Sequence, residues 1–254
     1  MKTILLAVAL FISSILSAQT DTLKSGVVNW NKLETNKQGR RQLIEGATRD
    51  LANLHIHSST LAPGQANHPL IAYNDVEELI VVKEGHLTVT IGDTTRSLEP
   101  GGIALIVAGD KQRFQNSSNK AVIYYVLQLK SKAPVNMQRG KQAGGSFIRN
   151  WSEMVMRATD KGESRPIVDR PSSMFGRFEM HATALNPGFA SHDPHTHRSE
   201  EIILMIKGNV IQQIGQTKHQ ASAGDLIYLA SGVLHNTNNT GSVQCGYFAI
   251  QWVN

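Results

Sequence analysis

Residues 165–188 read RPIVDRPSSMFGRFEMHATALNPG and repeat the pattern of residues 41–64, RQLIEGATRDLANLHIHSSTLAPG. The two stretches align without a gap, so that His57 falls on His181 and the closing Pro-Gly pairs coincide. A Pro-Gly pair after an extended segment is typical of a turn. The alignment indicates that the chain contains two copies of one structural unit.

The repeat continues through the rest of each copy once one residue is lost from the intervening loop. Polar residues and glycines then coincide as follows: Glu78 with Glu201, Gly85 with Gly208, Gly101 with Gly224, Gly109 with Gly232, Asn116 with Asn239, Tyr124 with Tyr247, and Gln128 with Gln251. A repeat of this length is a whole domain, longer than a solenoid unit. We therefore expect domains at 27–129 and 147–254, joined by a polar, glycine-rich linker at 130–146.

Each copy contains short apolar runs that end in turn residues. The runs lie at 79–82, 87–91, 103–107 and 122–129, and then at 202–206, 209–214, 226–229 and 247–252. Such runs, rich in Val, Ile and Tyr and bounded by Gly, Asp, Asn or Pro, predict antiparallel β-strands. The predicted fold class is therefore all-β, with a sandwich or barrel in each copy. Helices should be a minority, with a short helical or irregular stretch around 151–157.

The N-terminal residues predict an exported protein. A basic Met1-Lys2 start, an apolar run from Ile4 to Leu16 and small residues at the exit are typical of a secretory signal peptide, assigned to residues 1–18. A retained membrane anchor is the alternative reading. No other segment approaches the length of a membrane-spanning helix, so no membrane span is expected after signal cleavage. The expected location is the periplasm, or outside the cell if the protein is secreted.

Composition argues against several functional classes. The chain has 254 residues and a formal net charge of +5, but its Lys and Arg residues form no long basic run, so no nucleic-acid partner is expected. Cys245 is the only cysteine, which leaves no internal disulfide and favours a buried, inert thiol. The sequence has no Gly-rich phosphate loop and no Gly-x-Ser-x-Gly elbow. A bound metal is the remaining source of reactivity.

Metal-ligand residue types gather in the second copy. His195 and His197 are two residues apart, so on a strand both would face the same side; Glu201 has the same parity, although a turn at 198–199 can intervene. His235 follows a turn and would close the site from a neighbouring strand. Three imidazoles and one carboxylate suit one divalent transition metal: Mn, Fe, Ni, Co or Zn. Four protein ligands leave open positions on a six-coordinate ion.

The same string resembles the two cupin motifs. The first is Gly188, His195-x-His197, Glu201 and Gly208, and the second is Gly224, Ala230-Ser-Gly232, His235 and Asn239. The resemblance implies two tandem cupin barrels, which are double-stranded β-helices of jelly-roll type, and metal ligands at His195, His197, Glu201 and His235. The departures from the family pattern are Ala230, where proline is usual, and one extra residue before His195. Because both halves match, the chain is similar to a bicupin, and more narrowly to the exported bicupins of Bacteroidota.

The first copy keeps Glu78 but has Ala72, Asn74 and Gln112 where the second has histidines. A single carboxylate without imidazoles does not hold a transition metal tightly, so we expect a degenerate, metal-free site. A structural role, a dimerising role and a metal-free ligand pocket all remain open for this barrel. A homodimer is one of these alternatives.

Two further histidines in the second copy have alternative readings. His181 either lies beside the metal pocket, as a proton shuttle or substrate contact, or sits partly exposed on the outer face of its strand. His192 competes with His195 for the ligand role; the motif spacing favours His195 and leaves His192 at the rim.

The function implied by the resemblance is a metal-dependent enzyme acting on a small organic molecule, such as an organic acid, a sugar derivative or a phenolic compound. The family includes oxygenases, isomerases, lyases and hydrolases, and fold analogy does not choose among them. A decarboxylase with two metal sites is disfavoured because the first copy has lost its ligands. The alternative is a metal-assisted binding protein without turnover. A general acid or base facing the metal from the opposite wall would favour the enzyme.

Overall fold

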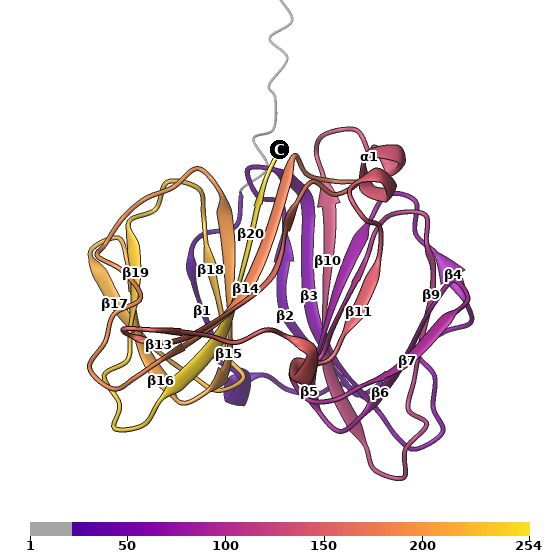
Figure 1. Cartoon of the computed structure of the whole chain (residues 1–254), viewed down its shortest axis with the longest axis horizontal. Helices are drawn as coiled ribbons and strands as arrows, with labels where there is room; N and C mark the ends of the chain where they lie inside the picture. The colour runs from indigo at the N-terminus through magenta and orange to yellow at the C-terminus, as the bar shows by residue number, and fades with distance from the viewer. Residues whose placement is uncertain (1–21) are drawn as a thin grey trace, which may run out of the picture.

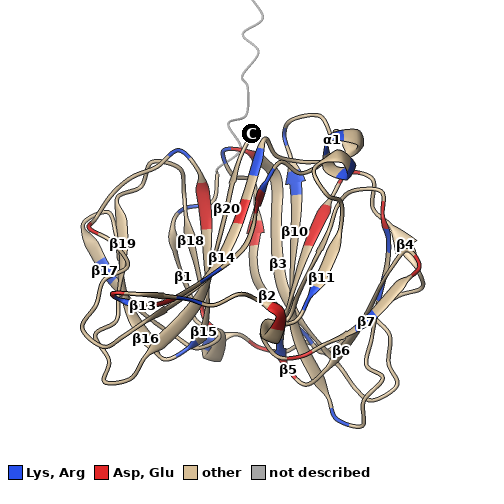
Figure 2. Ribbon diagram, viewed as in Figure 1, with Lys and Arg blue, Asp and Glu red and all other residues tan. Residues whose placement is uncertain are grey.

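The computed structural model describes residues 22–254, so the expected signal peptide at 1–18 lies outside the described residues. Two β-barrels lie side by side, one built mainly from each half of the chain (Figure 1). The all-β prediction is confirmed, and each predicted apolar run lies on a strand. No helix within residues 22–254 is long and apolar enough to cross a membrane. Basic and acidic residues are interspersed over both barrels (Figure 2).

The first half is built from ten strands and a short 3-10 helix. They are β1 (Gly26–Val28), η1 (Trp30–Lys32), β2 (Arg40–Gly46), β3 (Leu51–Leu61), β4 (Ile71–Ala72), β5 (Glu77–Glu84), β6 (Leu87–Ile91), β7 (Thr94–Leu98), β8 (Ile103–Ile106), β9 (Lys111–Gln115) and β10 (Val122–Ser131).

The second half follows a similar order after one α-helix, with β12 in addition and an isolated bridge in place of β4. Its elements are α1 (Met137–Gln142), β11 (Phe147–Arg149), η2 (Trp151–Glu153), β12 (Arg157–Thr159), β13 (Gly162–Arg170), β14 (Arg177–Leu185), β15 (Glu200–Lys207), β16 (Asn209–Ile214), β17 (Thr217–Ser222), β18 (Leu226–Leu229), β19 (His235–Asn238) and β20 (Cys245–Val253). Helix α1 lies within the expected linker, where the Asn136 side chain caps it by accepting a hydrogen bond from the backbone N–H of Arg139 at 2.9 Å.

Each barrel pairs a large sheet with a small one. The first has a six-stranded sheet, β11-β8-β5-β10-β3-β2, and a four-stranded sheet, β4-β9-β6-β7. The second has a seven-stranded sheet, β1-β18-β15-β20-β14-β13-β12, and a three-stranded sheet, β17-β16-β19. All pairings between these strands are antiparallel, as the alternation in the sequence predicted.

The large sheets are buried on both faces because they pack against each other as well as closing their own barrels. On β5, Leu79 and Val81 join a core shared by the two barrels, whereas Ile80 and Val82 belong to the core inside the first barrel. Strand β15 alternates in the same way between the shared core and the interior of the second barrel. Since side chains alternate across a strand, this parity decides which residues line each barrel.

The barrels also exchange short strands. Strand β1 pairs with β18 of the second barrel, and β11, from the start of the second half, pairs with β8 of the first. The expected boundaries at 27–129 and 147–254 follow the chain order of the copies, whereas these two strands cross between the sheets. After each exchanged strand comes an Asn-Trp pair, at Asn29-Trp30 and Asn150-Trp151. The similarity of VVNWNKL (27–33) to IRNWSEM (148–154) is the sequence signal for this exchange.

Two adjacent glutamates at the start of β15 have different surroundings. One lies against the other barrel, and the next faces the interior of its own barrel. Glu200 and Glu201 start β15; Glu200 lies on the shared face and Glu201 faces the barrel interior. Glu200 accepts hydrogen bonds from Tyr228 and Trp252, at 2.7 and 3.1 Å, in its own barrel. It also accepts bonds from three groups of the first barrel, which are the Thr48 hydroxyl and the backbone N–H groups of Arg49 and Asp50.

Glu77 makes the reciprocal contact from the first barrel, because it accepts hydrogen bonds from the Ser172 hydroxyl and the Ser173 backbone N–H, both at 2.7 Å. These buried clamps fix the strands that carry Glu78 and Glu201.

Candidate metal centre

The predicted ligands come from the loop before β15, from β15 itself and from the start of β19. His195 forms an isolated antiparallel bridge with His235, in which each backbone N–H donates to the other carbonyl, at 3.2 and 3.0 Å. The expected strand over residues 195–197 is therefore reduced to this single bridge, because the chain bends at 198–199 before entering β15.

His197, Glu201 and His235 form a compact group of possible metal donors. The Glu201 Oε2 atom lies 3.4 Å from His197 Nε2 and 3.3 Å from His235 Nε2. Glu201 and His235 are buried. Both imidazoles are oriented through their other nitrogen: His197 Nδ1 contacts the Ser199 carbonyl at 2.9 Å, and His235 Nδ1 contacts the Val233 carbonyl at 2.9 Å. This orientation directs both Nε2 atoms at the carboxylate.

The group fits a divalent transition metal. His197 Nε2 and His235 Nε2 are buried without a hydrogen-bond partner, as is His195 Nδ1. Buried polar nitrogens are costly unless they bind something, and imidazole with carboxylate is a donor set for Zn, Mn, Fe, Co or Ni. Donors each about 2.1 Å from one ion lie about 3.0–3.4 Å apart, close to the separations seen here.

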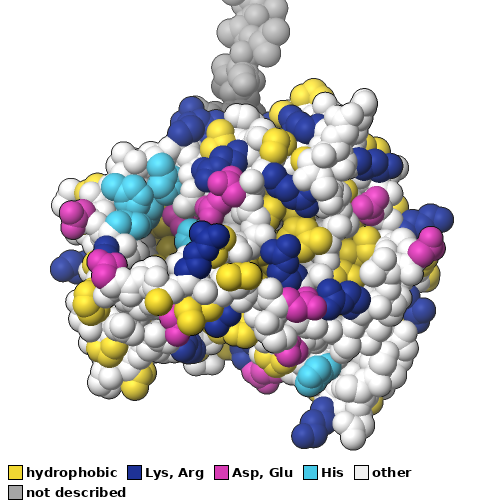
Figure 3. Space-filling model, in the orientation of Figure 1, with side chains coloured by type: hydrophobic (Ala, Val, Ile, Leu, Met, Phe, Trp, Pro, Cys, Tyr) yellow, Lys and Arg dark blue, Asp and Glu magenta, His cyan; other side chains and the backbone are white. Residues whose placement is uncertain are grey.

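His195 lies next to this group but belongs to a second cluster with His192 and His235. The His195 ring centroid is 4.7 Å from that of His235, 5.3 Å from that of His197 and 3.9 Å from that of His192. All four predicted ligands are therefore neighbours. His192 lies against His195 as well, although the cupin motif does not include it. Histidines of the second barrel gather at one place on the molecular surface in Figure 3.

The surroundings of the predicted ligands shift their pKa values in different directions. Burial opposes ionisation of Glu201, but the adjacent imidazoles of His197 and His235 outweigh it and lower the pKa of Glu201 to about 2. The adjacent Glu201 carboxylate raises the pKa of His197, whereas burial and the neighbouring imidazoles lower the pKa of His195. An ionised carboxylate amid imidazoles is prepared to bind a cation.

The centre opens into a cavity of about 410 Å³ inside the second barrel. Its apolar lining includes Leu185, Ile203 and Tyr247. Lys161 also lines it, and its ammonium group donates to the Ser191 carbonyl at 3.0 Å. Lys161 belongs to the turn between β12 and β13. The lining therefore combines the metal-ligand cluster, apolar side chains, the Lys161 ammonium group and the carboxylates of Asp160 and Glu163.

His181 lines this cavity. Its neighbours on β14, Met180 and Ala182, lie in the shared core, so strand parity directs His181 into the barrel interior. The His181 Nδ1 atom is 2.6 Å from Glu179 Oε1. Burial lowers the pKa of His181, but the bond to Glu179 and the charges of Glu179 and Glu201 outweigh it, and the net pKa is raised. Of the two readings of His181, the structure supports the position beside the metal-ligand cluster.

Sequence reasoning missed the groups that support the ligands. Ser199 accepts from His197 Nδ1 at 2.8 Å and donates to Gln251 Oε1 at 3.0 Å, which extends the orientation of His197 to β20. Glu179 orients His181, and Glu200 anchors the start of β15. The internal repeat could have indicated Gln251 and Glu200, because they align with Gln128 and Glu77 of the first copy.

The equivalent place in the first barrel is held by amides. Gln112 and Gln128 both donate to the Glu78 carboxylate, the latter at 2.6 Å. Burial raises the pKa of Glu78 despite these bonds. His55 bonds Gln128 Oε1 at 2.8 Å. Within residues 22–254, both clusters of possible metal donors lie in the second barrel.

The comparisons with known proteins agree with this architecture. The family model described as "Cupin domain" matches residues 57–127 and 182–251, together more than half of the chain. The chain belongs to the cupin family. One cupin domain lies in each half, so this cupin has the two-domain, bicupin-like organisation. A search of curated protein sequences finds no match.

Solved structures share the fold of this cupin at low sequence identity. The protein YlbA of E. coli is 16% identical with a TM-score of 0.70, and the match covers 95% of this chain and 97% of that one. An oxalate decarboxylase of Lactobacillus farciminis, in a formate complex, is 12% identical with a TM-score of 0.70, over 92% and 87% of the chains. Likeness at this identity shows the fold alone.

Proposed function

We propose that this cupin is a metal-dependent enzyme whose second barrel acts on a small organic molecule. The observation that carries the proposal is the placement of two functional groups around one cavity. The His197, Glu201 and His235 donors, with His195 beside them, line the 410 Å³ cavity that His181 also lines. A general acid or base that shares a cavity with a metal centre favours catalysis over binding.

The residues divide into four roles under this proposal. His195, His197, Glu201 and His235 would hold one divalent metal, Mn, Fe, Ni, Co or Zn, which would supply Lewis acidity or a site for dioxygen. His181 would hold or accept a proton at Nε2, because Nδ1 is engaged with Glu179 at 2.6 Å. The apolar wall would limit access of water, and Lys161 would attract an anionic group.

The substrate class that this cavity fits best is a small organic acid. Lys161 and the bound metal would be the cations that attract it, against the carboxylates of Asp160 and Glu163 in the same lining, and 410 Å³ lies within the range of small-molecule sites. Sugar derivatives and phenolic compounds are the other classes to be tested. The oxalate decarboxylase of known structure shares its fold with this cupin. The formate in its complex is a ligand of that decarboxylase and does not identify a substrate of this chain.

The experiment is a thermal-shift screen of organic acids, sugars and phenolics against metal-loaded protein, followed by product analysis of each hit under air and under nitrogen. Product under air alone would identify an oxygenase, and product under both gases an isomerase, lyase or hydrolase. Hits that stabilise the protein as mass action requires, but give no product under either gas, would overturn the enzyme in favour of a metal-assisted binding protein.

We also propose that the protein is exported to the periplasm or secreted, in the manner of the Bacteroidota bicupins that its sequence resembles. The signal-like residues 1–18 support this proposal. Mass spectrometry of the native envelope fraction should find a mature N-terminus near Gln19. Recovery of the chain from the cytoplasm with Met1 intact would contradict it.

A further inference from the structure

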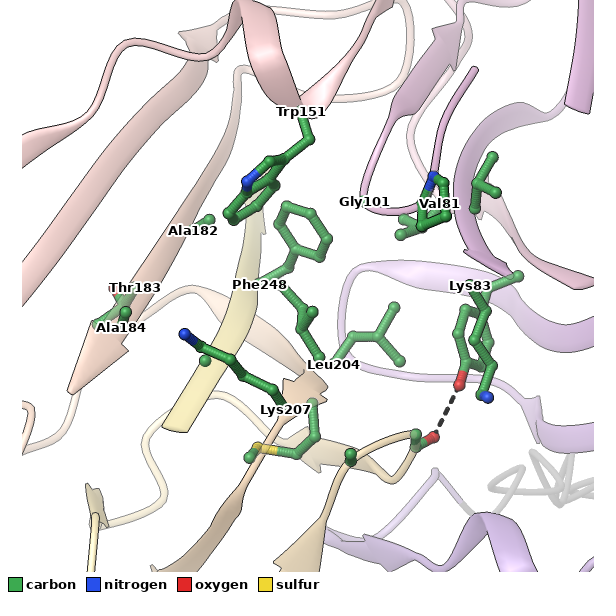
Figure 4. A pocket seen from close by; sticks show the side chains of 18 of the residues that line it. Val81, Lys83, Gly101, Trp151, Ala182, Thr183, Ala184, Leu204, Lys207 and Phe248 are labelled. Atoms are coloured by element: carbon green, nitrogen blue, oxygen red, sulfur yellow. Dashed lines mark hydrogen bonds between the residues drawn. The ribbon is translucent and has the colours of Figure 1, made fainter. Parts of the chain in front are cut away.

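A second cavity, of about 490 Å³, lies between the two barrels and is distinct from the metal centre. Both halves line it through corresponding positions, including Gly101 and Gly224 and the paired aromatic residues Tyr125 and Phe248. It shares only Glu163 and Thr183 with the cavity at the metal-ligand cluster. Figure 4 shows Trp151 and Phe248 side by side in its wall.

The cavity lies where the second half of the chain buries its tryptophan less deeply in the common interface than the first half does. Trp30 is 8% exposed and packs edge-on against Tyr125, with ring centroids 5.3 Å apart. Its counterpart Trp151 packs edge-on against Phe248 at 5.9 Å but stays only half-buried. The indole of Trp151 therefore contributes aromatic surface to the space that the interface leaves open.

The charged side chains around this cavity leave a net positive charge. Lys83 pairs with Glu84, and Arg165 lies 3.8 Å from Glu163 while its guanidinium covers the Trp151 ring at 4.6 Å. Lys207 has no carboxylate partner among residues 22–254; its ammonium group donates to Gln244 Oε1 at 2.8 Å. In Figure 4 its side chain extends below Phe248 towards Thr183 and Ala184.

We propose that the cavity between the barrels binds a small aromatic monoanion, a carboxylate or sulfonate, independently of the metal centre. A volume of 490 Å³ lies within the range of small-molecule sites, which are mostly apolar with a few polar groups. The aromatic body would pack among Trp151, Phe248 and Tyr125, where ring edges and faces are available. The anionic group would pair with Lys207, which has the unmatched charge.

The test compares two fluorescent probes with the same ring system on the purified mature protein. The anionic probe is 8-anilinonaphthalene-1-sulfonate, and the uncharged probe is N-phenyl-1-naphthylamine. We expect one sulfonate probe to bind per chain. Ala184→Phe should abolish binding of both probes by filling the cavity. Lys207→Gln should weaken the sulfonate about fivefold and leave the uncharged probe unaffected, the size expected for one partly exposed ion pair.

Controls separate a local effect from a general one. Lys218→Gln removes an exposed lysine of β17 and should change neither affinity. If Ala184→Phe does not fold, Ile206→Trp blocks the same cavity from a position that is 36% exposed. Sulfonate binding that survives the blocking substitution overturns the proposal, and so does a loss that is equal for both probes in Lys207→Gln.

Discussion

His181 and His57 occupy equivalent positions on β14 and β3, and both face the interior of their own barrel. They differ in the neighbour two residues earlier, which is Glu179 beside His181 and His55 beside His57. Burial, Arg40 and His55 lower the pKa of His57 to about 3, whereas Glu179 contributes to the raised pKa of His181. Burial is the largest cause at His57, whereas the carboxylate of Glu179 helps to raise the pKa of His181 against its own burial.

Replacing His181 with Asn should lower turnover without removing the metal. A general acid or base typically contributes about 10²–10⁴-fold to the rate, so kcat on the substrate found by screening should fall by that order. Metal content, measured by elemental analysis, should stay at the wild-type level because His181 lies outside the donor group. The matched control is His57→Asn in the first barrel, which should leave kcat unchanged. Equal kcat in wild type and His181→Asn would remove this residue from the mechanism.

Protonation of His57 predicts an acid-sensitive contribution to stability. The folded pKa of about 3 lies below the unfolded value of 6.5, so the unfolded chain binds the extra proton between these pH values. Stability from this residue is therefore present above pH 6.5 and is lost as the pH falls towards 3, at about 1.4 kcal/mol per pH unit. In His57→Gln, the free energy of unfolding from urea titrations should fall less between pH 7 and pH 4.5 than in wild type. Parallel losses in the two proteins would contradict the assignment.

At the level of single elements, β5 and β15 each begin with two adjacent glutamates whose side chains point to opposite faces. The first glutamate ties the strand to the other barrel, and the second faces the interior of its own barrel. Strand parity makes this division obligatory. Strand β15 therefore both fixes the packing of the barrels and presents the Glu201 carboxylate to the candidate metal centre.

Glu200→Ala should destabilise the protein strongly, because it leaves five hydrogen-bond donors in the interface without an acceptor. We expect a loss of about 3–5 kcal/mol in the free energy of unfolding, measured by urea denaturation. Glu45→Ala, at an exposed position of β2, is the control and should change stability by less than about 0.5 kcal/mol. A loss for Glu200→Ala no larger than that of the control would show that the clamp contributes little.

The two second glutamates predict opposite effects on metal content. Glu78→Gln should leave the metal stoichiometry unchanged, because Glu78 is surrounded by Gln112 and Gln128. Glu201→Gln should reduce it, because Glu201 lies between His197 and His235. Elemental analysis of both variants, prepared in parallel, makes the comparison. A drop in the Glu78 variant would mean that the first barrel takes part in metal binding.

Local sequence patterns were enough to predict most of the strands. Several features that the sequence did not predict depend on contacts between residues that are distant in the chain. The apolar runs located β5, β10, β15 and β20 because burial on both faces leaves continuous apolar stretches. The exchange of β1 and β11 was missed because three-residue strands carry little periodicity. Glu200 escaped notice because its partners Thr48 and Asp50 are distant in sequence. The cupin motif predicted the four ligands, but the spacing did not show that His195 would group with His192.

The whole molecule is a pair of similar barrels whose interior sites hold different side chains. Their large sheets share one core, so the interface acts as a scaffold for both interiors. The first barrel fills its site with amides, while the second combines imidazoles, a carboxylate and a cavity. We therefore expect the second barrel to be the only metal-binding part of residues 22–254.

The most direct test of this claim is the metal content of the purified protein, made without chelators, and of its His235→Ala variant. His235 belongs to both donor clusters, so its loss weakens every arrangement of ligands that the structure offers. Elemental analysis should find close to one transition metal per chain in wild type and a small fraction of that in the variant. Equal metal content in the two proteins would contradict the assignment of the centre.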